Sequence, residues 1–164
     1  MKVLLQGNPV ELEGVQPEVG QAAPNFALLD LEDNKVELNT LIADKPVIVS
    51  VVPDIGTAIC ALQTKRFNQE ASKIDGVHFV TISNNTKEEQ SNWCGAEGVT
   101  MTMLRDSELE FAKSYGLLIP AINRLARSIF VIDTKGNVVH ADISNEVAEE
   151  PNYEAALEKA KSLI

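Results

Sequence analysis

The amino-acid sequence predicts an α/β protein in which a mixed central sheet of five to seven strands lies between helices. A β-branched run at residues 47–52 is bounded by prolines, which is typical of a strand buried on both faces of a sheet. After this run, strand-like and helix-like segments alternate, as they do in layered α/β cores. No repeat or linker-like stretch interrupts the chain, so we expect residues 1–164 to form a single domain.

The N-terminal part of the chain is predicted to form two strand pairs. Their strands are short apolar or alternating runs, which cover residues 3–6 with 10–13, and 27–31 with 36–38. Turn-forming residues separate the partners, Gly7-Asn8-Pro9 in the first pair and Asp33-Asn34 in the second. An N-terminal β-hairpin therefore precedes the central strand.

Four helices and four further strands are expected after residue 53. The strands cover residues 77–83, 101–104, 127–133 and 138–143, and the helices start at Thr57, Thr86, Ser107 and Asn152. Thr86 with Glu89 and Ser107 with Glu110 match the capping-box pattern of helix N-termini. The last helix is expected to reach Leu163. Its apolar stripe consists of Tyr153, Leu157, Ala160 and Ile164.

Cys60 is the first candidate for chemistry. Thr57 stands at a predicted N-cap, so Cys60 lies in the first helical turn. Backbone N–H groups without an intrahelical acceptor and the helix dipole favour a thiolate there, and a thiolate is a nucleophile. An apolar face through Cys60, Phe67, Ala71 and Ile74 would turn the sulfur toward the sheet. The alternative is a small buried hydrophobe, since free cysteines are often inert.

Charge and cysteine usage exclude several function classes. The net charge of −10 argues against nucleic acids and anionic membranes as partners. Cys60 and Cys94 are too far apart for a C-x-x-C motif or a zinc site. Without a signal peptide or a run of ~18 apolar residues, the expected location is cytoplasmic. No metal or organic cofactor is implied, and His78 and His140 are expected to be structural or solvent-facing.

The spacing of Pro53, Thr57 and Cys60, P-x-x-x-T-x-x-C, resembles the active-site motif of the peroxiredoxin family. Further motifs are similar to those of one branch, the bacterial thiol peroxidases or atypical two-cysteine peroxiredoxins. These motifs are Ser50-Val51-Val52-Pro53, Gln63-Thr64, Arg66-Phe67-Asn68, Trp93-Cys94-Gly95-Ala96-Glu97-Gly98 and Leu125-Ala126-Arg127. The resemblance covers nearly the whole chain and implies a thioredoxin-like fold with an N-terminal β-hairpin extension.

The resemblance also implies a thiol-dependent hydroperoxide reductase. Cys60 would attack the peroxide, Thr57 would hydrogen-bond the sulfur or the substrate oxygens, and Arg127 would hold the thiolate and the departing oxygen. Pro53 would shield the site from water. The sulfenic acid would condense with Cys94 to an intramolecular disulfide, which needs local unwinding of a helix, and thioredoxin would reduce it. Hydrogen peroxide or organic hydroperoxides are the implied substrates, and a homodimer is the implied assembly.

Two other function classes are compatible with the same cysteines. A redox-sensing or binding module would react about once per chain, whereas a catalyst consumes peroxide repeatedly. A thioredoxin-like disulfide oxidoreductase is the second alternative, and the absence of C-x-x-C argues against it.

Overall fold

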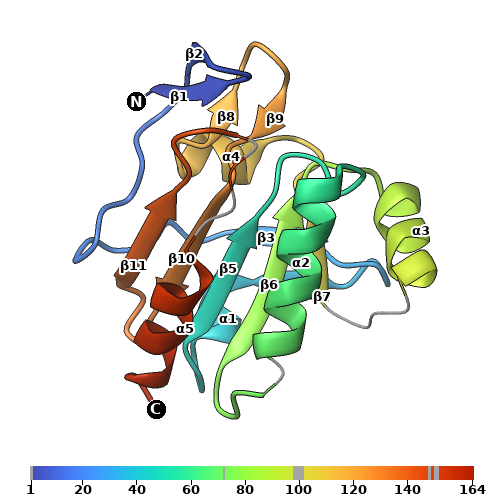
Figure 1. Cartoon of the computed structure of the whole chain (residues 1–164). Helices are drawn as coiled ribbons and strands as arrows, with labels where there is room; N and C mark the ends of the chain where they lie inside the picture. Colours follow the sequence, from blue (N-terminus) through green and yellow to red (C-terminus); the bar gives the residue numbers. More distant parts are fainter. Residues whose placement is uncertain (1, 72, 98–101, 148, 150–151) are drawn as a thin grey trace.

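A computed structural model gives the fold and describes residues 2–71, 73–97, 102–147, 149 and 152–164 (Figure 1). Of residues 58–63, 71, 96 and 97 it describes the backbone alone. Within these residues, the elements in chain order are β1 (Lys2–Leu5), β2 (Asn8–Glu11), β3 (Ala27–Leu29), β4 (Lys35–Glu37), α1 (Leu38–Leu41), β5 (Val47–Val51), α2 (Ala58–Ala71), β6 (His78–Ser83), α3 (Lys87–Glu97), β7 (Thr102–Arg105), α4 (Glu110–Ser114), β8 (Leu118–Ile119), β9 (Arg124–Leu125), β10 (Ser128–Ile132), β11 (Val138–Ile143) and α5 (Tyr153–Lys161).

The centre is a mixed sheet, in which seven strands of the described chain follow the order β11-β10-β5-β6-β7-β3-β4. Strands β5, β6 and β7 run parallel, and the other neighbours are antiparallel. Because β5 and β6 are parallel, their carboxyl ends lie at one edge of the sheet, and the loops that lead to α2 and α3 leave from there. The predicted mixed sheet is confirmed.

The two faces of the sheet have separate cores because successive strand residues point to opposite sides. All of β5 is buried, as predicted for the run 47–52. Val49 belongs to the core that includes Phe111 of α4. Ile48 faces the other way and packs with Phe67 of α2 and Tyr153 of α5. Figure 1 shows α2 and α5 on the same face of the sheet.

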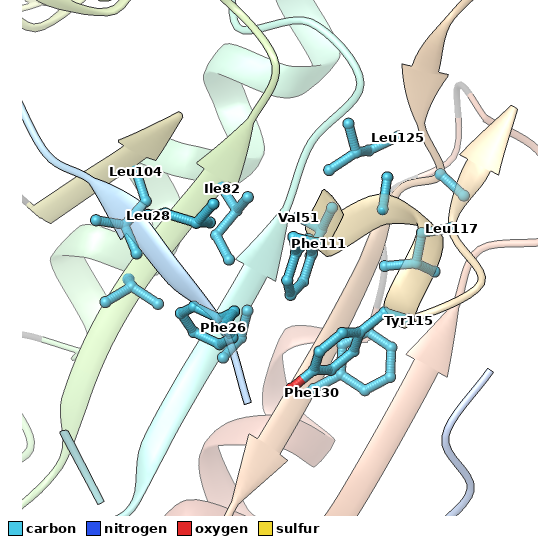
Figure 2. Packing of buried hydrophobic residues seen from close by; sticks show 14 of the residues in the cluster. Phe26, Leu28, Val51, Ile82, Leu104, Phe111, Tyr115, Leu117, Leu125 and Phe130 are labelled. Carbon is cyan, nitrogen blue, oxygen red and sulfur yellow. The ribbon is translucent and has the colours of Figure 1, made fainter. Parts of the chain in front are cut away.

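Aromatic rings fill the larger core (Figure 2). The centroids of Phe26 and Phe111 lie 5.4 Å apart in an edge arrangement, and those of Tyr115 and Phe130 lie 5.5 Å apart. Such edge-on pairs add to the free energy gained from burial. The Tyr115 hydroxyl donates to the Pro24 carbonyl oxygen at 2.7 Å. This hydrogen bond joins the segment that precedes β3 to Tyr115, the residue that directly follows α4.

The N-terminal hairpin is confirmed, with its turn one residue earlier than predicted. Val3 pairs with Val10 and Leu5 with Asn8, so Gln6 and Gly7 form the turn. Both have positive φ, 50° and 80°, as a two-residue hairpin turn that matches the strand twist requires. Asn8 belongs to β2 and not to the turn.

The first predicted capping box is present at the start of α3. The Thr86 N–H donates to Glu89 Oε1 at 2.9 Å, and the Glu89 N–H donates to Thr86 Oγ1 at 3.2 Å. Two N–H groups that the helix itself leaves unpaired are satisfied in this way. The C-terminal helix α5 starts next to Asn152, close to the predicted start, and Asn152 caps it, since its side chain accepts from the Ala155 N–H at 3.1 Å.

The second predicted capping box, Ser107 with Glu110, is wrong. Helix α4 begins at Glu110, and Leu109 before it has a left-handed φ of 61°. The Asp106 carboxylate, which is buried, accepts from the N–H groups of Phe111 at 3.1 Å and Ala112 at 2.9 Å. Asp106 rather than Ser107 accepts these hydrogen bonds for two reasons. A carboxylate is a stronger acceptor than a hydroxyl, and the turn at residues 106–109 places the Asp106 side chain over the N-terminus of α4.

Two short elements are absent from the sequence-based prediction, α1 and the β8–β9 hairpin. The hairpin pairs Leu118 with Leu125 and Ile119 with Arg124. Elements of two to four residues are too short to show a period. Ile164 is also not part of the α5 stripe, because the helix ends at Lys161 and Ile164 is 65% exposed. No helix in the described ranges has the length and apolar character that a membrane crossing needs.

Candidate active site

A pocket of about 380 Å³ opens beyond the carboxyl end of β5. It is lined by residues from the end of β1 and the β1–β2 turn, the loop before α2, the β8–β9 hairpin, the residue just before β10 and the segment after β11. They are Leu5, Gln6, Pro53, Asp54, Thr57, Ile122, Arg124, Arg127, Glu146 and Val147. Three predicted site residues, Pro53, Thr57 and Arg127, are among them. Figure 1 shows the hairpins β1–β2 and β8–β9 together at this end of the sheet.

Thr57 directly precedes α2, at the position predicted for the N-cap. Its hydroxyl and its N–H both donate to the Asp54 carbonyl oxygen, at 3.0 and 3.1 Å, and close the turn 54–57. Cys60 lies three residues later in the first turn of α2, where helical N–H groups lack intrahelical acceptors. The Cys60 side chain lies outside the described residues, so the direction of its sulfur stays a prediction.

Arg127 forms a buried part of the pocket wall, with 2% of its surface exposed. Its Nε donates to the Val147 carbonyl oxygen at 2.7 Å. The Val147 N–H in turn donates to the Leu4 carbonyl oxygen at 2.8 Å, and the Leu4 N–H donates to the Asn145 carbonyl oxygen at 2.6 Å. A buried guanidinium is stable only where acceptors surround it, so β1 and the segment 145–147 support Arg127.

Glu146 supports the same wall from a second direction. Its carboxylate accepts from the N–H groups of Gln6 at 3.0 Å and Gly7 at 3.3 Å, the two turn residues of the N-terminal hairpin. The sequence analysis did not single out Glu146. No local pattern could have done so, because its partners stand 140 and 139 positions away in the chain.

Asp54 is the second carboxylate of the pocket. Its Oδ1 accepts from the Gly56 N–H at 2.9 Å and from Asn85 Nδ2 at 3.0 Å, and its Oδ2 lies 3.8 Å from Arg124 Nη2. Burial disfavours the charged form, but the Asn85 and Gly56 hydrogen bonds and the Arg124 charge outweigh it and lower the pKa of Asp54. Asp54 is therefore ionised at neutral pH and paired with Arg124.

Cys94 lies in α3 and does not line the pocket. Its half-buried thiol donates to Met103 Sδ at 3.3 Å and packs against the cluster of Val52, Ile55 and Met103. Burial raises the pKa of Cys94, so the thiol is protonated at neutral pH. Because the thiolate is the nucleophile, Cys94 is unreactive in this conformation.

Trp93 packs against the same cluster as Cys94. A buried indole usually finds a partner for its N–H, but Trp93 Nε1 is buried without one among the described residues. An unpaired buried donor costs free energy. The Trp93 contact thus stabilises this part of α3 through apolar packing alone.

The two histidines lie outside the pocket lining, in agreement with a structural role. His78 Nε2 is 3.1 Å from Asp44 Oδ1, and the Asp44 carboxyl has a lowered pKa because of this contact. His140 is half-buried on β11, and burial lowers its pKa.

Comparisons with known proteins agree with this fold. The model of the AhpC/TSA family matches residues 19–141. A thiol peroxidase of Listeria innocua is 39% identical over 162 residues, which cover 98% of each chain. A thiol peroxidase of Bacillus subtilis is 38% identical over 167 residues, which cover 99% of this chain and 98% of that one. The chain belongs to the AhpC/TSA family of peroxiredoxins.

A solved structure extends the agreement to three dimensions. A peroxiredoxin-like protein from Aquifex aeolicus has a TM-score of 0.93 and 30% identity, and the match covers 99% of this chain and 97% of that one. The predicted thioredoxin-like peroxiredoxin fold with its N-terminal hairpin is confirmed. The chain is also confirmed as a peroxiredoxin enzyme of the thiol peroxidase class.

Proposed function

We propose that this enzyme reduces hydroperoxides with the Cys60 thiolate, and that Thr57, Arg127 and Pro53 complete the reacting site. The observation that carries the proposal is that Pro53, Thr57 and Arg127 line one pocket although Arg127 is remote in sequence. The helix that contains Cys60 starts at the next residue after Thr57. The similarity to thiol peroxidases over nearly the whole chain supports the same chemistry.

In the first step, the thiolate attacks the terminal oxygen of the hydroperoxide. An S–O bond forms while the O–O bond breaks, and the electron pair of that bond goes to the departing oxygen, which takes up a proton and leaves as an alcohol or water. Cys60 becomes sulfenic acid. Negative charge moves from sulfur to oxygen, so a fixed cation that faces both atoms lowers the barrier. Arg127 is the proposed cation.

Thr57 would orient the substrate. Its hydroxyl hydrogen is directed to the Asp54 carbonyl oxygen, so toward a substrate the Thr57 oxygen would act as an acceptor. The O–H of a hydroperoxide would be the donor. Leu5, Ile122 and Val147 supply apolar surface in the pocket, which supports binding of the organic group of an alkyl hydroperoxide beside hydrogen peroxide.

In the second step, the Cys94 thiol would condense with the sulfenic acid, forming a disulfide and releasing water. The contact of Cys94 with Met103 must first be broken, so the step needs a rearrangement of α3. A dithiol protein such as thioredoxin would then reduce the disulfide by thiol exchange. We also propose that the enzyme acts as a homodimer.

A coupled assay tests the proposal. The purified protein is combined with thioredoxin, thioredoxin reductase and NADPH, and NADPH consumption is followed after addition of cumene hydroperoxide or hydrogen peroxide. We expect many turnovers per chain, and none for Cys60→Ser with an unchanged circular dichroism spectrum. Turnover by Cys60→Ser near the parent rate would remove Cys60 from the mechanism.

A further inference from the structure

We propose that Asn85 is a positioning residue for peroxide reduction, because it holds the loop that carries Pro53 and Thr57 and joins it to the start of α3. Asn85 follows β6, is 1% exposed and does not line the pocket. It therefore acts through the loop and not on the substrate. The inference rests on the proposed role of this loop in the reaction.

The first contact joins Asn85 to the middle of the loop. Its Oδ1 accepts from the Ile55 N–H at 2.9 Å. A backbone N–H can only donate, so this contact fixes which side of the amide group is the oxygen. The amide NH₂ is consequently directed to Asp54, whose Oδ1 lies 3.0 Å from Asn85 Nδ2.

A second set of hydrogen bonds, made through Asp54, fixes the next residue of the loop, Gly56. Asp54 Oδ1, which accepts from Asn85, also accepts from the Gly56 N–H at 2.9 Å. The side chains of Asn85 and Asp54 thus bind the N–H groups of Ile55 and Gly56, the two central residues of the turn that Thr57 closes. A glycine in such a turn has much conformational freedom, so its geometry depends on these bonds.

The chain itself joins Asn85 to α3, the helix of Cys94. Asn85 directly precedes Thr86, whose N–H donates to Glu89 Oε1 at 2.9 Å. Glu89 is the acidic member of the α3 capping box. The buried Asn85 amide accordingly holds the loop before Cys60 from a position next to the start of α3.

Loss of the Asn85 amide should displace Pro53 and Thr57 relative to Arg127. Arg127 donates to the Val147 carbonyl oxygen, which belongs to another segment, so the loop can shift relative to it. Misplacement of reacting groups by about 1 Å can lower a rate by on the order of 10²-fold. The reaction with peroxide should therefore slow even though no residue of the pocket is changed.

The test uses full-length protein with Cys94→Ser as the parent, so that Cys60 is the single thiol. We measure the second-order rate constant for cumene hydroperoxide and titrate the thiol by its absorbance at about 240 nm. Asn85→Ala should lower the rate constant about 10- to 100-fold and shift the thiol titration. The matched control is Asn92→Ala, an exposed asparagine of α3, which should match the parent in both measurements.

A second variant remains informative if Asn85→Ala does not fold. Asn85→Asp keeps an acceptor for the Ile55 N–H but places a carboxylate against Asp54 and Glu89, with Arg124 as the cation that faces them. Two carboxylates this close share a proton at low pH and repel each other when both are charged. The rate deficit relative to the parent should be largest near pH 8 and shrink toward pH 5.

The possible results separate this inference from the proposed function. A parent that does not react with peroxide would overturn both. An active parent would overturn the inference alone if folded Asn85→Ala had the parent rate and thiol titration, or if the deficit of Asn85→Asp did not change with pH. A lower melting temperature with unchanged kinetics would likewise reduce Asn85 to a purely structural role.

Discussion

Arg127 Nε donates to the Val147 carbonyl oxygen at 2.7 Å, and this bond joins the proposed catalytic cation to a segment that is itself paired with β1. The guanidinium thus has a backbone acceptor that the fold holds in place. Preorganised donors of this kind stabilise charge that develops in a transition state, because they need not reorient during the reaction.

Replacement of Arg127 by methionine should slow peroxide attack by on the order of 10²- to 10³-fold, the usual cost of a donor lost at a developing charge. It should also raise the pKa of the Cys60 thiol, since a nearby cation that favours the thiolate is removed. Stopped-flow kinetics and thiol titration measure the two effects. If both match the wild type, Arg127 does not belong to the reacting site.

Glu146→Ala should loosen the N-terminal hairpin. The substitution leaves the N–H groups of Gln6 and Gly7 without their carboxylate partner, at a cost of about 1 kcal/mol in the free energy of unfolding. Urea denaturation measures the loss, and amide exchange should rise in residues 2–11. Glu149→Ala, which changes an exposed glutamate of the same segment, is the control and should leave both unchanged.

Cys94→Ser should retain the first oxidation and lose recycling by thioredoxin. The variant should consume about one equivalent of peroxide and accumulate a sulfenic acid on Cys60, detectable by mass spectrometry after trapping with dimedone. Steady-state activity equal to that of the wild type would show that another thiol resolves the sulfenic acid.

Opening of α3 should begin after Gln90. The Gln90 side chain is fully buried, and its Nε2 donates to Ser83 Oγ at 3.0 Å and to the Leu104 carbonyl oxygen at 3.1 Å. Beyond it, Trp93 is held by apolar contacts alone. Residues with few stabilising contacts open locally at low free-energy cost.

Peroxide should therefore change the fluorescence of Trp93, the one tryptophan of the sequence, and dithiothreitol should reverse the change. Amide exchange should increase in residues 91–97 and stay slow at Glu89 and Gln90, whose N–H groups donate to Thr86. Formation of a Cys60–Cys94 disulfide without any change in fluorescence or exchange would contradict the unwinding model.

His140 should make stability fall in mild acid. Burial lowers its pKa in the folded protein; the Asp142 charge opposes this effect and the Lys159 charge adds to it. The unfolded chain, with the ordinary pKa of about 6.5, therefore takes up the proton first as the pH falls. The stabilising contribution is fully present above about pH 6.5 and is lost progressively below it. In His140→Gln, the drop in melting temperature between about pH 7.5 and 5 should be smaller; an equal drop would assign it to other groups.

Features that depend on near neighbours in the chain could be predicted from the residues alone. The β-branched run of β5 predicts a buried strand wherever it lies, and the capping box of Thr86 and Glu89 needs only residues within one helical turn. The spacing of Pro53, Thr57 and Cys60 is also a local feature, because it is set by the end of one strand, one turn and the start of one helix.

Contacts between groups that are distant in the chain follow from the strand order and could not be predicted from the residues alone. Strand order brings Arg127 to the pocket of Pro53 and Thr57, and it places Glu146 on the hairpin turn. Asp106 rather than Ser107 caps α4 for a related reason, because the fold of the preceding turn selects the acceptor. Asn85 carries no sequence signal for its contact with Ile55, which depends on β5 and β6 lying side by side. Such contacts join residues far apart in the chain, and local propensity and spacing do not encode them.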